Sequence, residues 1–146
     1  METSKDQDGD DMNHRVLIIE DEYLIAMDVE DMVSSSPVEA DVVGLASDKE
    51  NALILAPLAD IALVDVNLSD GPSGPEIGRI LAEDFGVTVI FMTANPEVVA
   101  MGVKGALGVV RKPVDSRTIE QLLEYAIARR SHQRAPAPRA MQVFAA

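Results

Sequence analysis

The chain lacks cysteine and tryptophan, and its only aromatic residues are two tyrosines and three phenylalanines. The absence of cysteine excludes disulfides, thiolate metal ligands and thiol catalysis. No segment approaches the roughly 20 apolar residues that a membrane-spanning helix needs. The acidic, polar start of the chain is the opposite of a signal peptide. We therefore expect a cytoplasmic protein that makes no membrane contact.

Basic residues are also scarce, since 12 lysines and arginines face 25 aspartates and glutamates and give a formal net charge of −13. Such a charge disfavours non-specific binding to nucleic acid, and we expect no nucleic-acid partner. The length of 146 residues suits one domain, and 47% hydrophobic residues are enough for a sizeable core. Because only 3% are aromatic, that core is expected to be aliphatic.

Both ends of the chain lack apolar periodicity. Residues 1–14 carry many acids, and we predict a disordered acidic tail. Residues 131–146 contain arginines and the sequence Ala-Pro-Ala-Pro, and we predict a flexible basic tail rich in proline and alanine. The expected domain is therefore residues 15–130.

Within this domain, apolar runs typical of buried strands alternate with stripes typical of helices. Strands are expected at residues 15–20, 38–46, 60–65, 87–92 and 106–111. Residues 22–34 and 116–130 have helical spacing, a helix ends near Phe85, and a capping box at residues 47–50 begins another. Glycines at 102, 105 and 108 limit the fourth helix, after residue 96, to a short or irregular one. This alternation predicts an α/β fold with a doubly wound parallel five-stranded sheet.

Reactive side chains follow four of the expected strands. Glu20 and Asp21 follow the first strand, Asp65 ends the third, Thr93 follows the fourth, and Lys112 follows the fifth. In a parallel sheet these ends share one edge, which is where such sheets bind ligands. Three acids, a hydroxyl and an ammonium suit a divalent cation, a carboxylate nucleophile and a phosphoryl group.

Four motifs occur in order along the domain: residues 16–22 (VLIIEDE), residues 63–67 (LVDVN), residues 91–94 (FMTA) and the pair Lys112-Pro113. In this order and at this spacing they resemble the receiver domains of two-component response regulators. The resemblance spans residues 15 to about 130. It implies a flavodoxin-like (βα)5 fold with strand order 2-1-3-4-5.

The resemblance also implies roles for the acids. Asp65 would be the phosphoacceptor, a carboxylate that forms an aspartyl phosphate. Glu20, Asp21 and Asp65, with the backbone carbonyl of Asn67, would hold Mg²⁺ or Mn²⁺, because hard divalent cations take oxygen ligands. Asp21 is expected to bind the metal directly and Glu20 through a water.

The remaining family positions concern the phosphoryl group and the switch. Lys112 would contact the phosphoryl oxygens, and the peptide bond before Pro113 would be cis, as in the family. Thr93 would hydrogen-bond a phosphoryl oxygen, and the small Ala94 would let its loop approach. Asn95, like Asn67, occupies a position that tunes hydrolysis in the family, and we expect a phosphoryl lifetime of minutes.

The sequence departs from the family pattern at two places. Val109 stands where receivers usually carry an aromatic residue whose movement accompanies that of Thr93, so the switch is expected to be altered. The segment between Thr93 and Lys112 is also shorter than in the common chemotaxis type. Because this segment contributes to the usual output surface, the choice of downstream partner stays open.

The implied function is that of a single-domain response regulator, which is a phosphoacceptor and not an enzyme. Its phosphodonor would be a histidine kinase or a histidine phosphotransfer protein, and it would act as a phospho-switch on an unknown protein partner or as a phosphate sink. One alternative is a pseudo-receiver that binds proteins without carrying phosphate. A haloacid-dehalogenase-type phosphatase is disfavoured, because Asn67 stands where that class needs a general acid.

Overall fold

The computed structural model describes residues 13–145, which form one sheet with helices on both faces. In chain order, the elements are β1 (His14–Ile19), α2 (Tyr23–Ser35), β2 (Ala40–Ala46), α3 (Lys49–Leu55), η1 (Ala56–Leu58), β3 (Ile61–Val64), α4 (Gly74–Phe85), β4 (Thr88–Thr93), η2 (Pro96–Val99), β5 (Gly108–Arg111), α5 (Ser116–Arg130) and β6 (Met141–Val143).

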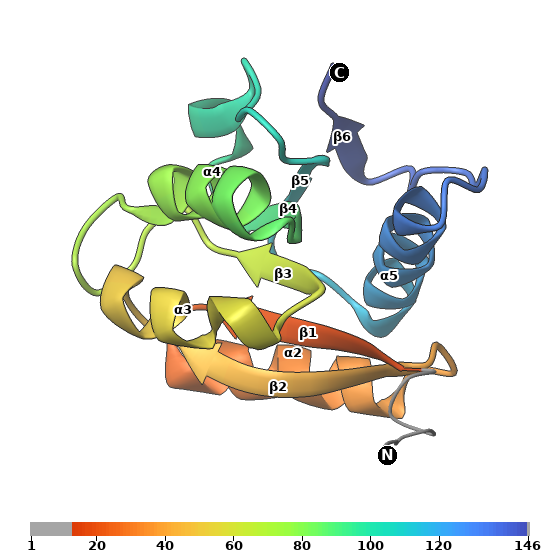
Figure 1. Cartoon of the computed structure of the whole chain (residues 1–146), viewed down its shortest axis with the longest axis horizontal. Coiled ribbons are helices and arrows are strands. Elements are labelled where there is room, and N and C mark those ends of the chain that lie inside the picture. The colour runs from red at the N-terminus through yellow and green to blue at the C-terminus, as the bar shows by residue number, and fades with distance from the viewer. Residues whose placement is uncertain (1–12, 146) are drawn as a thin grey trace.

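The sheet has the order β2-β1-β3-β4-β5-β6 (Figure 1). The first five strands are parallel, and their carboxyl ends therefore lie at one edge. β6 runs antiparallel to β5 at the outer edge. The five predicted parallel strands and the order 2-1-3-4-5 are thus confirmed, and a sixth strand is added.

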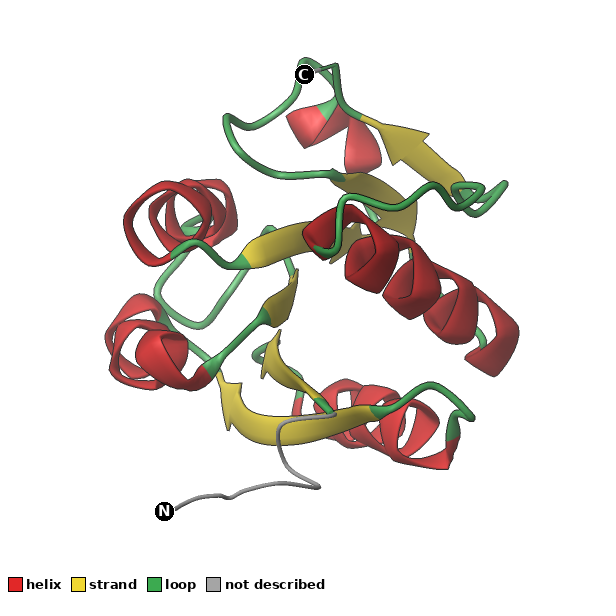
Figure 2. Cartoon of the chain, turned by 45° about the vertical axis from the view of Figure 1, so that its right-hand side comes forward, coloured by secondary structure: helices red, strands yellow, loops and turns green. Residues whose placement is uncertain are grey.

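Alternating strand residues point into two separate apolar layers. On one face, Val16 and Ile18 lie in a cluster with the inner sides of α2 and α5. On the other face, Leu17 and Ile19 lie in a cluster with residues of α3 and α4. Figure 2 shows helices on both faces of the sheet. Burial of the central strands on both faces explains why they read as continuous apolar runs rather than as alternating patterns.

The helices agree with the sequence pattern, with one correction at a helix start. α5 has the predicted bounds, and Asp115 caps it by accepting from the backbone N–H of Thr118. The predicted capping box at residues 47–50 is wrong, because Asp48 is the N-cap of α3 and accepts from the backbone N–H of Asn51 at 2.9 Å. An aspartate is at least as good an N-cap as a serine, and the N-cap here lies one residue after Ser47.

The fourth helix is reduced to η2, a four-residue 3₁₀ turn, as the sequence predicted. Gly102 and Gly105, which follow it, have positive φ values of 94° and 87°. A helix cannot continue through this left-handed backbone, and other residues rarely adopt it. The connection from β4 to β5 is therefore a short turn followed by an irregular loop.

The predicted flexible tail from 131 to 146 is not what the structure shows for residues 141–143. These residues form β6, and the buried Met141 joins the apolar layer beneath α5. The acidic tail predicted at residues 1–14 lies outside the described residues except at its end, where His14 begins β1. Among residues 13–145, no helix is long and apolar enough to cross a membrane.

Candidate functional site

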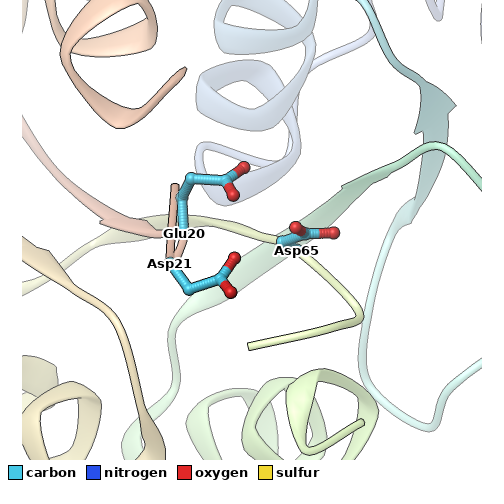
Figure 3. Close-up of side chains that lie close together, drawn as sticks. All are labelled: Glu20, Asp21 and Asp65. Carbon is cyan, nitrogen blue, oxygen red and sulfur yellow. The ribbon is translucent and has the colours of Figure 1, made fainter. Parts of the chain in front are cut away.

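The carboxyl ends of β1 and β3 bring three carboxylates together, as predicted. Glu20 and Asp21 follow β1, Asp65 follows β3, and one oxygen from each lies within 4.8 Å of the others (Figure 3). Glu20 and Asp65 are buried, whereas Asp21 is exposed. The site therefore has a buried floor and one acid at its rim.

Asp65 is held by contacts at both carboxylate oxygens. Its Oδ1 accepts from the backbone N–H of Val66 at 2.7 Å, and its Oδ2 accepts from Lys112 Nζ at 3.0 Å. Its own N–H donates to the carbonyl of Ile19 on the adjacent β1 at 2.9 Å. These contacts fix the orientation of the carboxylate while leaving it at the wall of a pocket.

Gly74, at the start of α4, allows the chain to pass close behind Asp65. A Cβ at this position would lie 2.0 Å from the Asp65 carbonyl oxygen and 2.6 Å from the Val66 Cα. Backbone atoms cannot yield to such an overlap. The glycine therefore serves the packing of α4 against the loop that carries Asp65.

Lys112 is shared between two buried acids. Its Nζ lies 2.5 Å from Glu20 Oε1 and 3.0 Å from Asp65 Oδ2. Burial alone would lower the pKa of Lys112, but these hydrogen bonds outweigh it and raise the pKa. The lysine is therefore a fixed positive charge between the two carboxylates.

Burial has the opposite consequence for Glu20, whose pKa it raises to about 7. The hydrogen bonds from Lys112 and from the Glu22 N–H favour the ionised form, but the nearby Asp65 carboxylate opposes it. Lys112 does not offset the burial of Glu20 fully, and the pKa of this carboxyl therefore lies above its ordinary value. The site has an excess of carboxylate that a cation would neutralise.

Thr93 ends β4 and is almost fully buried. Its hydroxyl oxygen accepts from the N–H of Asn95 at 3.1 Å, and its carbonyl accepts from the N–H of Lys112 at 2.9 Å. The exposed Ala94 is tied to β5, because its carbonyl accepts from Arg111 Nη1 at 3.0 Å. The loop after β4 is thus joined to the strand that leads to Lys112.

A pocket of about 520 Å³ opens above these residues. The site residues that line it are Asp21, Asp65, Asn67, Thr93, Ala94, Asn95, Lys112 and Pro113. The peptide bond between Lys112 and Pro113 is cis, as predicted. Val109 faces away from this pocket, into the apolar layer beneath α4.

The residues present fit a hard divalent cation. Three carboxylates offer oxygen ligands within 4.8 Å of one another, and Lys112 contributes one positive charge against them. Mg²⁺ binds through one or two carboxylates while keeping several waters, which suits a pocket with one acid at its rim. The participation of the Asn67 carbonyl stays a prediction.

One feature beside the site was not predicted. Gln142 and Phe144 come from the C-terminal segment, and Phe144 packs against the apolar layer that contains Val109. The Phe144 and Phe91 ring centroids lie 6.5 Å apart. The sequence signal was the short run Met-Gln-Val-Phe at residues 141–144, which is too brief to stand out as a strand.

Comparison with known proteins identifies this arrangement. The model of the response regulator receiver domain matches residues 16–124, which includes every acid of the site together with Thr93 and Lys112. The chain belongs to the response regulator receiver domain family. Receiver domains are signalling modules of two-component systems, and the family is not an enzyme family.

Among curated proteins, the chain is 41% identical over 90 residues to the phyllosphere-induced regulator PhyR of Methylorubrum extorquens. The match covers 60% of this chain and 33% of that protein, so the chain corresponds to about a third of the curated relative's length.

Among solved structures, the chain is similar to the receiver domain of Erythrobacter litoralis PhyR, with 31% identity and a TM-score of 0.70. That match covers 86% of this chain and 96% of the other. PhyR from Brucella abortus shares 35% identity with a TM-score of 0.70, over 82% of this chain and 50% of the other.

Proposed function

We propose that this protein is a response regulator that accepts a phosphoryl group on Asp65 from a histidine kinase or a histidine phosphotransfer protein. The observation that carries the proposal is the shared contact of Lys112 with Asp65 and Glu20 at the wall of the pocket. It provides an oriented carboxylate nucleophile and a fixed cation beside it. These are the groups that transfer of an anionic phosphoryl group requires.

In the transfer, an Asp65 oxygen attacks the phosphorus, the P–N bond of the phosphohistidine breaks, and an acyl phosphate forms. Lys112 neutralises part of the phosphoryl charge, and the Thr93 hydroxyl donates to a phosphoryl oxygen. A bound Mg²⁺ or Mn²⁺, held by Glu20, Asp21 and Asp65, would neutralise the remaining charge. Attack of water on phosphorus then releases phosphate and restores the Asp65 carboxylate.

Asn67 and Asn95 line the pocket, and their side chains would order that water. We therefore propose an acyl phosphate lifetime of minutes. The output would be a phosphorylation-dependent contact with another protein or the draining of phosphate from a shared kinase. PhyR from Bartonella quintana is described as an anti-anti-sigma factor, and its likeness to this chain supports a protein rather than a nucleic-acid partner. Such a pathway predicts a cytoplasmic protein.

Intact-mass measurement after incubation with acetyl phosphate and Mg²⁺ tests the proposal. We expect a gain of one phosphoryl group, lost when a chelator removes the metal. Val109 stands where receivers usually carry an aromatic residue, and this difference favours a second candidate function, that of a pseudo-receiver that binds proteins without phosphate. If neither acetyl phosphate nor beryllofluoride with Mg²⁺ modifies or binds the chain, the pseudo-receiver function replaces the proposed one.

A further inference from the structure

Two consecutive basic residues stand at the end of β5, and they make different contacts. Lys112 contacts the buried acids of the site. Arg111, the last residue of β5, is paired in register with Thr93 at the end of the adjacent β4 (Figure 1). Its side chain reaches the loop that follows β4 and donates there to the backbone carbonyl of Ala94. Arg111 therefore connects the end of β5 to the loop that begins at Thr93.

The peptide unit between Ala94 and Asn95 is held at both of its polar ends. Its carbonyl accepts from Arg111 Nη1 at 3.0 Å, and its N–H donates to Thr93 Oγ1 at 3.1 Å. The backbone just before it is also fixed, because the Thr93 carbonyl accepts from the N–H of Lys112 at 2.9 Å. Rotation of this peptide would break the bond to Arg111 and the bond to Thr93 together. The orientation of the peptide therefore depends on Arg111.

This arrangement prepares the Thr93 hydroxyl to donate. A hydroxyl has one proton to donate and two lone pairs that accept. Because the Thr93 oxygen accepts from the Asn95 N–H, its proton is directed away from that N–H, and Thr93 lines the pocket where a phosphoryl oxygen would accept it. Hydrogen bonds in series strengthen one another, and the first bond in this series comes from a charged guanidinium. The series runs from Arg111 through one peptide to Thr93.

Arg111 also lies near Glu97, but this contact is weak. The Arg111 Nη2 and Glu97 Oε1 atoms are 3.9 Å apart, and the two side chains are 65% and 67% exposed. Ion pairs in this setting contribute little, because water screens the charges and two long side chains must be ordered. The bond to the Ala94 carbonyl is shorter by almost an ångström. The carbonyl is therefore the contact through which Arg111 acts.

We propose that Arg111 is a positioning residue for phosphoryl transfer, which fixes the peptide between Ala94 and Asn95 and, through it, the Thr93 hydroxyl. The inference rests on the proposed function, since Thr93 needs a phosphoryl group to act on. The acids that could hold the metal follow β1 and β3, on the other side of the pocket from this loop. Loss of Arg111 should therefore slow phosphoryl transfer and leave the affinity for Mg²⁺ unchanged.

The initial rate of phosphorylation of the full chain by acetyl phosphate and Mg²⁺, followed by intact mass, tests this role. Arg111→Ala should be slower by at least about fivefold, less than the roughly 100-fold cost of removing a donor that touches the reacting group directly. Arg111→Lys keeps a charged donor and should react within about twofold of the native rate. Isothermal titration calorimetry without acetyl phosphate should give Arg111→Ala the native affinity for Mg²⁺.

Two variants serve as matched controls and should react at the native rate. Arg79→Ala removes an exposed arginine of α4, whose side chain pairs with Glu83 at 3.4 Å. Glu97→Gln removes the weak ion pair and leaves the bond from Arg111 to the carbonyl. If Glu97→Gln slows the reaction as much as Arg111→Ala, the ion pair and not the carbonyl is the contact that matters, and the proposal is overturned.

The amide proton of Asn95 tests the contact without any phosphorylation. In Arg111→Ala its bond to Thr93 should weaken, and its NMR resonance should move upfield, whereas Arg79→Ala should leave it in place. An unmoved resonance, an unchanged phosphorylation rate or a loss of Mg²⁺ affinity in Arg111→Ala overturns the positioning role, while the proposed function stands if the native chain is phosphorylated. A native chain that takes no phosphoryl group overturns both.

Discussion

The two edges of the same sheet hold carboxylates in opposite electrostatic settings. At the carboxyl edge, Glu20, Asp21 and Asp65 share Lys112, and burial raises the pKa of Glu20 to about 7. At the amino edge, one carboxylate, Asp60, lies near two arginines. At the first edge the carboxylates outnumber the one ammonium, whereas at the second two guanidinium groups face one carboxylate.

The amino edge shows what a structural ion cluster looks like in this fold. Asp60 Oδ2 accepts from the backbone N–H of Arg15 at 2.8 Å, and Arg130 donates to the carbonyls of Asp60 and Gly86 and to the Thr88 hydroxyl. Burial would raise the pKa of Asp60, but the contacts with Arg15 and Arg130 lower it overall. Such a cluster needs no ligand, whereas the three acids of the carboxyl edge could hold a metal ion.

Replacing Lys112, the positively charged side chain at the carboxyl edge, should have the largest effect on stability. Lys112→Met leaves Glu20 and Asp65 buried without a partner, and breaking a buried pair in this way costs about 3–5 kcal/mol. Urea unfolding at pH 8 with a chelator present measures the loss. Lys104→Met, at an exposed lysine, is the control and should change stability by less than about 0.5 kcal/mol. A comparably small loss of stability for Lys112→Met would contradict the claim that Glu20 and Asp65 depend on Lys112 for their stability in the folded protein.

Glu20→Gln should remove a pH dependence in the metal-free protein. Because the folded pKa of Glu20 is raised from 4.5 to about 7, its contribution to stability is present below pH 4.5 and is lost as the pH rises through 7. The shift corresponds to at most about 3 kcal/mol between these limits. Urea unfolding of both chains from pH 5 to pH 8 measures it. If the free energy of unfolding changes with pH to the same extent in the native chain and the variant, Glu20 is not the source of the pH dependence.

Magnesium should stabilise the protein through the carboxyl edge alone. At a concentration 100 times its dissociation constant, a ligand that binds only the folded state adds about 2.7 kcal/mol. Thermal unfolding with and without Mg²⁺ measures this gain, which Asp21→Asn should reduce and Asp60→Asn should leave intact. Equal gains in the two variants would place the cation elsewhere.

Substitution at the amino edge should have the smallest effect on stability. Asp60 should stabilise the fold more at neutral than at acid pH, which is the opposite of Glu20. The lowered pKa of Asp60 stabilises the fold above pH 3.8, and this contribution is lost as the pH falls further. Asp60→Asn should therefore cost about 1 kcal/mol near neutral pH and less in acid. Urea unfolding at pH 7 and pH 3 tests the sign. A larger loss at pH 3 than at pH 7 would be inconsistent with a stabilising Asp60 carboxylate.

The parallel core and the site could be predicted because their signals are local. Each buried strand is a continuous apolar run, and Glu20, Asp65 and Lys112 follow directly after such runs. The spacing of the motifs then placed these side chains at one edge, where the structure has them. What the sequence could not show is that one lysine contacts both buried acids, since this depends on side-chain directions across three strands.

The C-terminal strand was missed for a different reason. β6 is three residues long, and the residues of β5 with which it pairs lie more than about 30 positions earlier in the sequence. No local pattern therefore predicts it. The glycine at 108 was read as a limit on the preceding helix, whereas its physical role is to admit Gln142 and Met141. The start of α3 was misplaced because both Ser47 and Asp48 are good caps and only the backbone decides between them.

The most direct measurement compares the same substitution at the two edges. Intact-mass analysis with acetyl phosphate and Mg²⁺ should show one added phosphoryl group on the native chain and on Asp60→Asn, and none on Asp65→Asn. Phosphorylation of Asp65→Asn to the native extent would contradict the assignment of Asp65 as the phosphoacceptor, and with it the functional distinction between the two edges.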